Sequence, residues 1–137
     1  MIYTERFVRV PSKRTPRIIL EPGKIFIMGR SIPDNPGEFY RPVHEWITDY
    51  VKNYKGKTII EFGFEYINTS STKWIFSFLK ELSEMKEIVN NARVTWYYEL
   101  GDEDMSELGF ILRSLIECPF LVVEVKEISK TGHDKIL

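Results

Sequence analysis

The 137-residue sequence has one cysteine and two histidines, and these small numbers exclude several kinds of site. A single thiol, Cys118, excludes an internal disulfide and a zinc site built from several cysteines. His44 and His133 lie far apart in the sequence and lack the spacing of a metal-binding pair. We therefore expect no metal and no cofactor. The cysteine content is typical of a reduced, cytoplasmic protein.

An excess of charge of one sign is also absent, because 19 Lys and Arg residues oppose 20 Asp and Glu residues. Such a chain has no general electrostatic attraction to nucleic acid or to an anionic membrane. Its apolar runs reach about five residues, whereas a membrane-spanning helix needs about 20. The first residues lack the apolar region of a signal peptide, and the scattered glycines form no phosphate-binding loop. We expect neither nucleic acid nor membrane as a partner.

The sequence does contain a regular alternation of strand-like and helix-like segments. The turn at Pro22-Gly23 separates the apolar runs 17–20 and 25–29, which predicts a β-hairpin. Apolar residues then recur at helical spacing in three segments, and alternate with polar residues in the segments between them. The predicted helices run from Asn35 to about Tyr54, from 68–72 to Asn90, and from 101–104 to about Leu115; the predicted strands are 58–67, 94–99 and 120–125.

This order of elements predicts an α/β domain of two layers. Strands that are joined by helices pair in parallel, and their alternating pattern indicates that helices cover only one face of the sheet. The expected sheet is mixed and mostly parallel, with the N-terminal hairpin at its edge. We predict a single domain over residues 1–137, with an N-terminal arm over 1–16 and a flexible polar tail over 129–137.

Two groups of residues are candidates for a catalytic or ligand-binding site. Glu61 and Glu65 lie on one face of a predicted strand, but about 13 Å apart, which is too far for a catalytic pair. The aromatic residues Trp46, Trp74 and Trp96 are most simply explained as core. The alternative function is a small-molecule-binding domain or a hydrolase that uses a pocket beside them.

The segment Asn68-Thr69-Ser70-Ser71-Thr72 lies where a predicted strand ends and a predicted helix begins. The free N–H groups of a helix start attract anions, and the helix dipole favours negative charge there. A phosphate would add about −1.5 to −2 charge at this turn and change the surface that a partner meets. One interpretation is a regulatory phosphorylation site. The other is an ordinary helix cap, which accounts for one of the four hydroxyl groups.

Three stretches of the sequence together carry a resemblance to a known family. They are residues 29–35 followed by the helix with Trp46, residues 66–73, and residues 94–98 followed by an acidic helix and Cys118-Pro119-Phe120. In this arrangement the chain resembles the SiaC family of bacterial regulatory phosphoproteins. The resemblance covers about Pro16 to Val125, and it implies a STAS-like fold, similar to that of anti-sigma factor antagonists.

The resemblance implies a partner-switching protein that is not an enzyme. By matching position, Thr69 is the expected phosphorylation site, while Asn68, Ser70 and Ser71 shape the turn and cap the helix. The implied partners are a dedicated kinase, a PP2C-type phosphatase, and a diguanylate cyclase or another effector. The unmodified form would bind and activate the cyclase, which raises cyclic-di-GMP and promotes biofilm or aggregation. Thr72 stands where an aliphatic residue is expected, so Thr72 or Ser70 is a second candidate acceptor.

Overall fold

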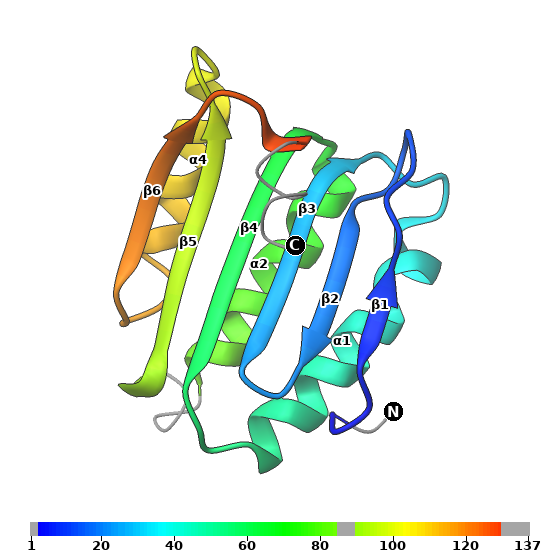
Figure 1. Ribbon diagram of the computed structural model, residues 1–137, viewed down its shortest axis with the longest axis vertical. Helices are drawn as coiled ribbons and strands as arrows, with labels where there is room; N and C mark the ends of the chain where they lie inside the picture. Colours follow the sequence, from blue (N-terminus) through cyan, green and yellow to red (C-terminus); the bar gives the residue numbers. More distant parts are fainter. Residues whose placement is uncertain (1–2, 85–89, 130–137) are drawn as a thin grey trace.

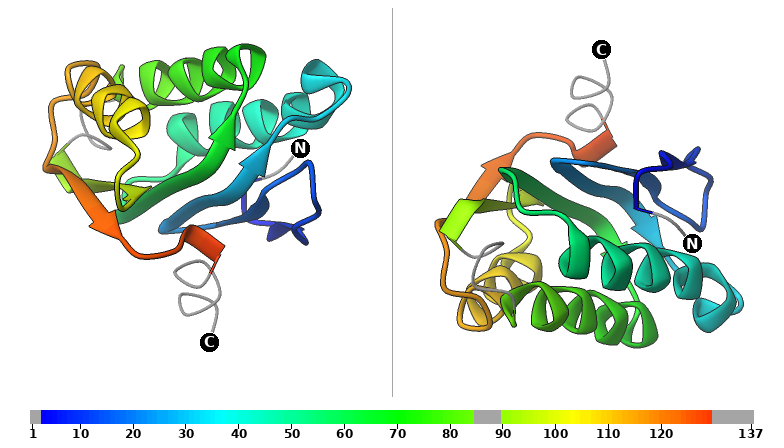
Figure 2. Two further views of the ribbon diagram at one scale, coloured as in Figure 1. Left: turned by 90° about the horizontal axis from the view of Figure 1, so that it is seen from above. Right: turned by 90° about the horizontal axis from the view of Figure 1, so that it is seen from below.

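The helices lie on one face of a six-stranded sheet (Figures 1 and 2). The structure is a computed structural model that describes residues 3–84 and 90–129. The helices are α1 (Pro36–Asn53), α2 (Thr69–Ser83) and α4 (Glu103–Arg113). The strands are β1 (Phe7–Arg9), β2 (Arg17–Glu21), β3 (Lys24–Ser31), β4 (Thr58–Ile67), β5 (Ala92–Glu99) and β6 (Phe120–Val125).

The strands lie in the sheet in their order along the chain. β1, β2 and β3 pair antiparallel, and β3 to β6 pair in parallel. The predicted hairpin is β2–β3, where Gly23 has a φ of 90° that favours glycine. Residues 7–9 of the predicted arm add β1 to its outer side. The predicted fold class, a two-layer α/β domain with a mixed, mostly parallel sheet, is confirmed; the STAS-like comparison stays a prediction.

The main core lies between the sheet and the helices. Ile60, Phe62 and Phe64 of β4 are fully buried there, as the alternation in this strand predicts. Helix α1 contributes an apolar stripe that includes Trp46 and Tyr50, whose rings stack with centroids 4.8 Å apart. The Tyr50 hydroxyl bonds to Thr58 and accepts from the Gly23 N–H, so this packing holds α1 against the starts of β3 and β4.

The alternation in β4 places Glu61 and Glu65 on the helix-free face of the sheet and predicts that this face is wet near its middle, but the structure differs. Glu61 is only 7% exposed, and its carboxylate accepts a hydrogen bond of 2.8 Å from the Tyr97 hydroxyl. The chain after β6 crosses this face (Figure 2), and Ile128 packs there with Phe26 and Met28. Glu61 is therefore buried, although the strand pattern places its carboxylate on an open face.

Two predicted features lie partly outside the described residues. The second helix is predicted to run to Asn90, but α2 ends at Ser83 with Glu84 as its C-cap, and residues 85–89 lie outside the described residues. The expected flexible tail over 129–137 also lies outside them, apart from its first residue. Within the described ranges, no helix is long and apolar enough to cross a membrane.

Gly109 allows α4 to approach β5 closely. A Cβ atom at this position would lie 2.4 Å from Cδ1 of Trp96, whose indole N–H donates to the Met105 carbonyl at 2.8 Å. Gly109→Ala should therefore lower the free energy of unfolding by about 1–2 kcal/mol, because overpacking outweighs the gain of about 1 kcal/mol in helix propensity. Urea denaturation of the variant measures this change.

The matched control is Gly37→Ala in the first turn of α1. There the nearest atom to an added Cβ lies 3.6 Å away, so the control should be as stable as the wild type or more stable. Equal stabilisation of both variants would contradict the close packing of Gly109 against Trp96.

Candidate functional site

The candidate site is the turn between β4 and α2, at the edge of the sheet where the parallel strands end. Asn68 is the N-cap of α2, and its side-chain oxygen accepts a hydrogen bond of 2.8 Å from the Ser71 N–H. The Asn68 N–H donates to the Ser31 carbonyl at 3.0 Å, which joins the turn to the end of β3. The turn is therefore held to α2 by the Asn68 side chain and to β3 by the Asn68 backbone N–H.

The hydroxyl groups of this turn have three different environments. Ser71 is fully buried, and its hydroxyl accepts a hydrogen bond of 2.9 Å from Ser31. The Thr72 hydroxyl donates to the Asn68 carbonyl at 3.0 Å, within the first helical turn. Thr69 and Ser70 are exposed. Solvent and a modifying enzyme thus have open access to Thr69 and Ser70, but not to Ser71.

Ser31, Ser71 and Tyr40 form a buried chain of hydroxyl groups beneath the turn. The Tyr40 and Ser31 hydroxyl oxygens lie 2.5 Å apart, and Ser31 gives its only proton to Ser71, so Tyr40 donates to Ser31. Burial raises the pKa of Tyr40, and its hydrogen bonds to Ser31 and Ser71 lower that pKa by less. Tyr40 therefore stays protonated, and the chain joins β3, α1 and α2 at one point.

The start of α2 is electrostatically unlike the starts of the other two described helices. Its first turn has no acidic residue, whereas α1 has Glu38 and α4 has Glu103 and Asp104 in the equivalent turn. Those carboxylates complement the positive end of the helix dipole, and α2 has no such group. A negative group on Thr69, the first residue of α2, would supply this missing charge.

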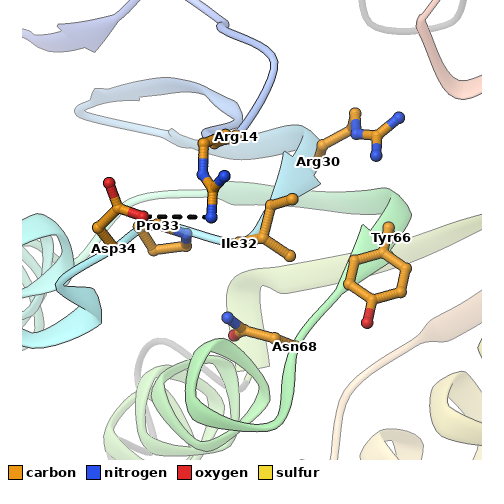
Figure 3. A pocket seen from close by; sticks show the side chains of 7 residues that line it. All are labelled: Arg14, Arg30, Ile32, Pro33, Asp34, Tyr66 and Asn68. Carbon is orange, nitrogen blue, oxygen red and sulfur yellow. Dashed lines mark ion pairs between the residues drawn. The ribbon is translucent and has the colours of Figure 1, made fainter.

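An open pocket of about 500 Å³ lies beside the turn (Figure 3). Its walls are Arg14, Arg30, Ile32, Pro33, Asp34, Tyr66 and Asn68. A guanidinium nitrogen of Arg14 lies 3.1 Å from the Asp34 carboxylate, and one of Arg30 lies 4.0 Å from that of Glu65. The sequence analysis did not single out this pocket. Six of its lining residues nevertheless lie in the segments 29–35 and 66–73, which carry the family resemblance, and Arg14 comes from the N-terminal arm.

The residues considered for enzymatic or metal chemistry lie elsewhere. Trp46 and Trp96 are fully buried, and the Trp46 indole N–H donates to the Glu5 carbonyl at 2.9 Å. Trp74 stacks on Tyr40 at the edge of the core. Burial raises the pKa of the Cys118 thiol, which disfavours the reactive thiolate. Residues 3–84 and 90–129 contain no cluster of His, Cys, Asp or Glu side chains that could hold a metal ion.

Fold and site together define a two-layer α/β domain with an exposed threonine at a capped helix start beside a basic pocket. A family model described as SiaC family regulatory phosphoprotein matches residues 10–125. The chain belongs to the SiaC family. This match confirms the resemblance drawn from the 29–35, 66–73 and 94–98 segments.

Solved structures from Pseudomonas aeruginosa have the same fold. SiaC superposes with a TM-score of 0.78 at 21% identity, over 88% of this chain and 99% of that one. A structure of the diguanylate cyclase SiaD in complex with its activator SiaC gives 0.77 at 23% identity, over 87% and 99%. A curated relative from the same species, described as uncharacterized, is 25% identical over 100 residues, which are 73% of this chain and 79% of that protein.

Proposed function

We propose that this chain is a partner-switching regulatory protein, controlled by reversible phosphorylation of Thr69. The observation that carries the proposal is the contrast among the four hydroxyl groups of the turn. Thr69 and Ser70 are exposed, whereas Ser71 is buried and Thr72 bonds to the backbone. Of the two exposed hydroxyl groups, Thr69 is the one at the first position of α2, and it matches the acceptor position that the family resemblance implies. Membership of a family of regulatory phosphoproteins supports the assignment of a phosphorylated residue.

The proposed partner of the unmodified form is a diguanylate cyclase, which the chain binds and activates. This part rests on the family and on the likeness to SiaC, which is the activator of a diguanylate cyclase in P. aeruginosa. A dedicated kinase and a PP2C-type phosphatase would set the fraction that is modified. In this role the chain, a single domain with its arm, regulates an enzyme and has no catalytic site of its own.

Phosphorylation would act locally, because the turn is fixed before it is modified. Asn68 caps α2, and the Ser31–Ser71–Tyr40 chain holds the first turn of this helix against β3 and α1. A phosphate on Thr69 would complement the helix dipole and leave the fold in place. It would block the partner by repulsion and by the cost of removing water from the new charge.

The experiment that tests the proposal is phosphopeptide mapping by mass spectrometry on the protein from its native cells. We expect phosphate on Thr69 in part of the population and none on Ser71, because the Ser71 hydroxyl is buried. Cells that carry Thr69→Ala should lose the phosphopeptide, while cells that carry Thr72→Val should keep it. Full coverage of the peptide without phosphate under all growth conditions would reject covalent switching.

A further inference from the structure

The pocket beside the turn has two guanidinium groups whose present partners hold them weakly. Arg14 comes from the segment between β1 and β2, and its partner Asp34 has a side chain that is 88% exposed. Arg30, on β3, has a side chain that is 50% exposed and lies 4.0 Å from Glu65. Exposed ion pairs contribute little to stability, so both arginines are open to a better-placed acceptor.

The other walls add features that are typical of protein interfaces. The Tyr66 side chain is 54% exposed at the end of β4, and Ile32 and Pro33 supply apolar surface between the charged groups (Figure 3). The oxygen of the Asn68 amide is used in the helix cap, which leaves the NH2 group of this amide to donate. Tyrosine and arginine are enriched among the residues that dominate binding energy.

We propose that this pocket receives a carboxylate, from an Asp or Glu side chain of the effector protein. This inference rests on the proposed function and names the contact that the switch controls. Guanidinium groups bind carboxylates through two parallel hydrogen bonds, and an incoming carboxylate would displace the Asp34 side chain from Arg14. The occupant is an anion because two arginines and an amide donor oppose the single carboxylate of Asp34 among the lining residues.

The position of Thr69 links this pocket to the proposed switch. Thr69 follows Asn68, which lines the pocket, so a phosphate on Thr69 would lie at its rim. Its charge of about −1.5 to −2 would repel an incoming carboxylate and compete with it for the two guanidinium groups. One modification would thus remove the anchor of the partner without any change in the fold.

The first test probes the pocket alone, with N-acetyl-glutamate as the carboxylate. The Nε–H signals of Arg14 and Arg30 are followed by NMR during a titration of the unmodified protein. Both should shift along one saturable curve, while the signal of Arg93, exposed at the start of β5, should not follow it. A linear drift that is equal for all three arginines would overturn the assignment of the pocket.

The second test uses the diguanylate cyclase of the same cells and calorimetric titration. Arg14→Gln and Arg30→Gln should each weaken binding by tenfold or more, and Arg30→Lys should restore only part of the affinity, because lysine lacks the planar fork. Arg93→Gln removes one charge at the opposite end of the sheet and should leave affinity unchanged. Circular dichroism of each variant is the control for folding, and its spectrum should match that of the wild type.

The two tests separate failure of this inference from failure of the proposed function. If the wild type binds the cyclase and the two glutamine variants bind equally well, the carboxylate pocket is wrong and the switch stands. If the wild type does not bind the cyclase, the proposed function is wrong. The proposal that the carboxylate comes from this effector is then wrong as well.

Discussion

Phosphorylation of Thr69 is expected to weaken the binding of this chain to the proposed diguanylate cyclase partner by about a hundredfold. Like charges that meet at an interface cost several kcal/mol, and about 2.7 kcal/mol corresponds to a hundredfold change in Kd. Thr69 is exposed at the start of α2, so the whole charge of the phosphate faces the partner. The fold should be unaffected, because the positive end of α2 has no acidic residue to repel the phosphate.

Calorimetric titration of the cyclase with protein that carries phosphothreonine at position 69 measures this change directly. Thr69→Ala should bind like the wild type, and Thr69→Glu should lose only part of the affinity because it adds a single charge. Ser70→Glu places a charge on the next exposed residue and shows how far the effect depends on position. Equal affinity of the phosphorylated and unmodified proteins would reject the switch.

Ser71→Asp is expected to lower the free energy of unfolding by about 3–5 kcal/mol, although the substitution lies two residues from Thr69. Ser71 is fully buried and accepts its hydrogen bond from Ser31, in a chain that ends at Tyr40. A carboxylate there would be larger than the serine hydroxyl, and it would lose its water without gaining a positive partner.

Denaturation in urea at neutral pH checks this expectation. Thr69→Asp is the matched control, and it should change the free energy of unfolding by no more than about 0.5 kcal/mol because Thr69 is exposed. Ser71→Ala keeps the side chain small, and its free energy of unfolding should lie between those of Ser71→Asp and Thr69→Asp. If Ser71→Asp were as stable as Thr69→Asp, the buried chain of hydroxyl groups would be wrong, and Ser71 would become a candidate acceptor.

The fold could be predicted from the sequence because its signals are local. The alternation over 58–67 defines β4, and the turn at Gly23 defines the β2–β3 hairpin. The start of α2 is encoded by Asn68, a good N-cap residue that precedes an apolar-periodic run. Each of these patterns depends on residues that lie close together in the sequence.

The covering of the helix-free face could not be predicted in the same way. The pattern of β4 places Glu61 and Gly63 on that face, but it does not show that Ile128 packs over Gly63. The Ile128 N–H donates to the Glu99 carboxylate at 3.0 Å, a contact across 29 positions of the chain. A contact of this kind leaves no periodic signal in either segment.

The candidate site was predictable only in part, because some of its features are local in the sequence and others depend on distant residues. The hydroxyl-rich turn is contiguous in the sequence, so its place at a helix start could be read from residues 68–72. The environment of each hydroxyl depends on distant residues. The Ser71 hydroxyl, for example, accepts from Ser31, which in turn accepts from Tyr40. The basic pocket likewise brings together Arg14, which precedes β2, Arg30 of β3 and Tyr66 of β4, and these residues lie far apart in the sequence.

The firm anchoring of the first turn of α2 has a consequence for the enzymes that would modify it. Thr69 is already helical, and its neighbours Asn68, Ser71 and Thr72 are committed to hydrogen bonds that an extended peptide would break. A kinase that phosphorylates Thr69 therefore has to recognise a folded surface rather than a linear consensus. The phosphatase meets the same requirement, so the substrate choice of both enzymes would depend on the shape of this domain.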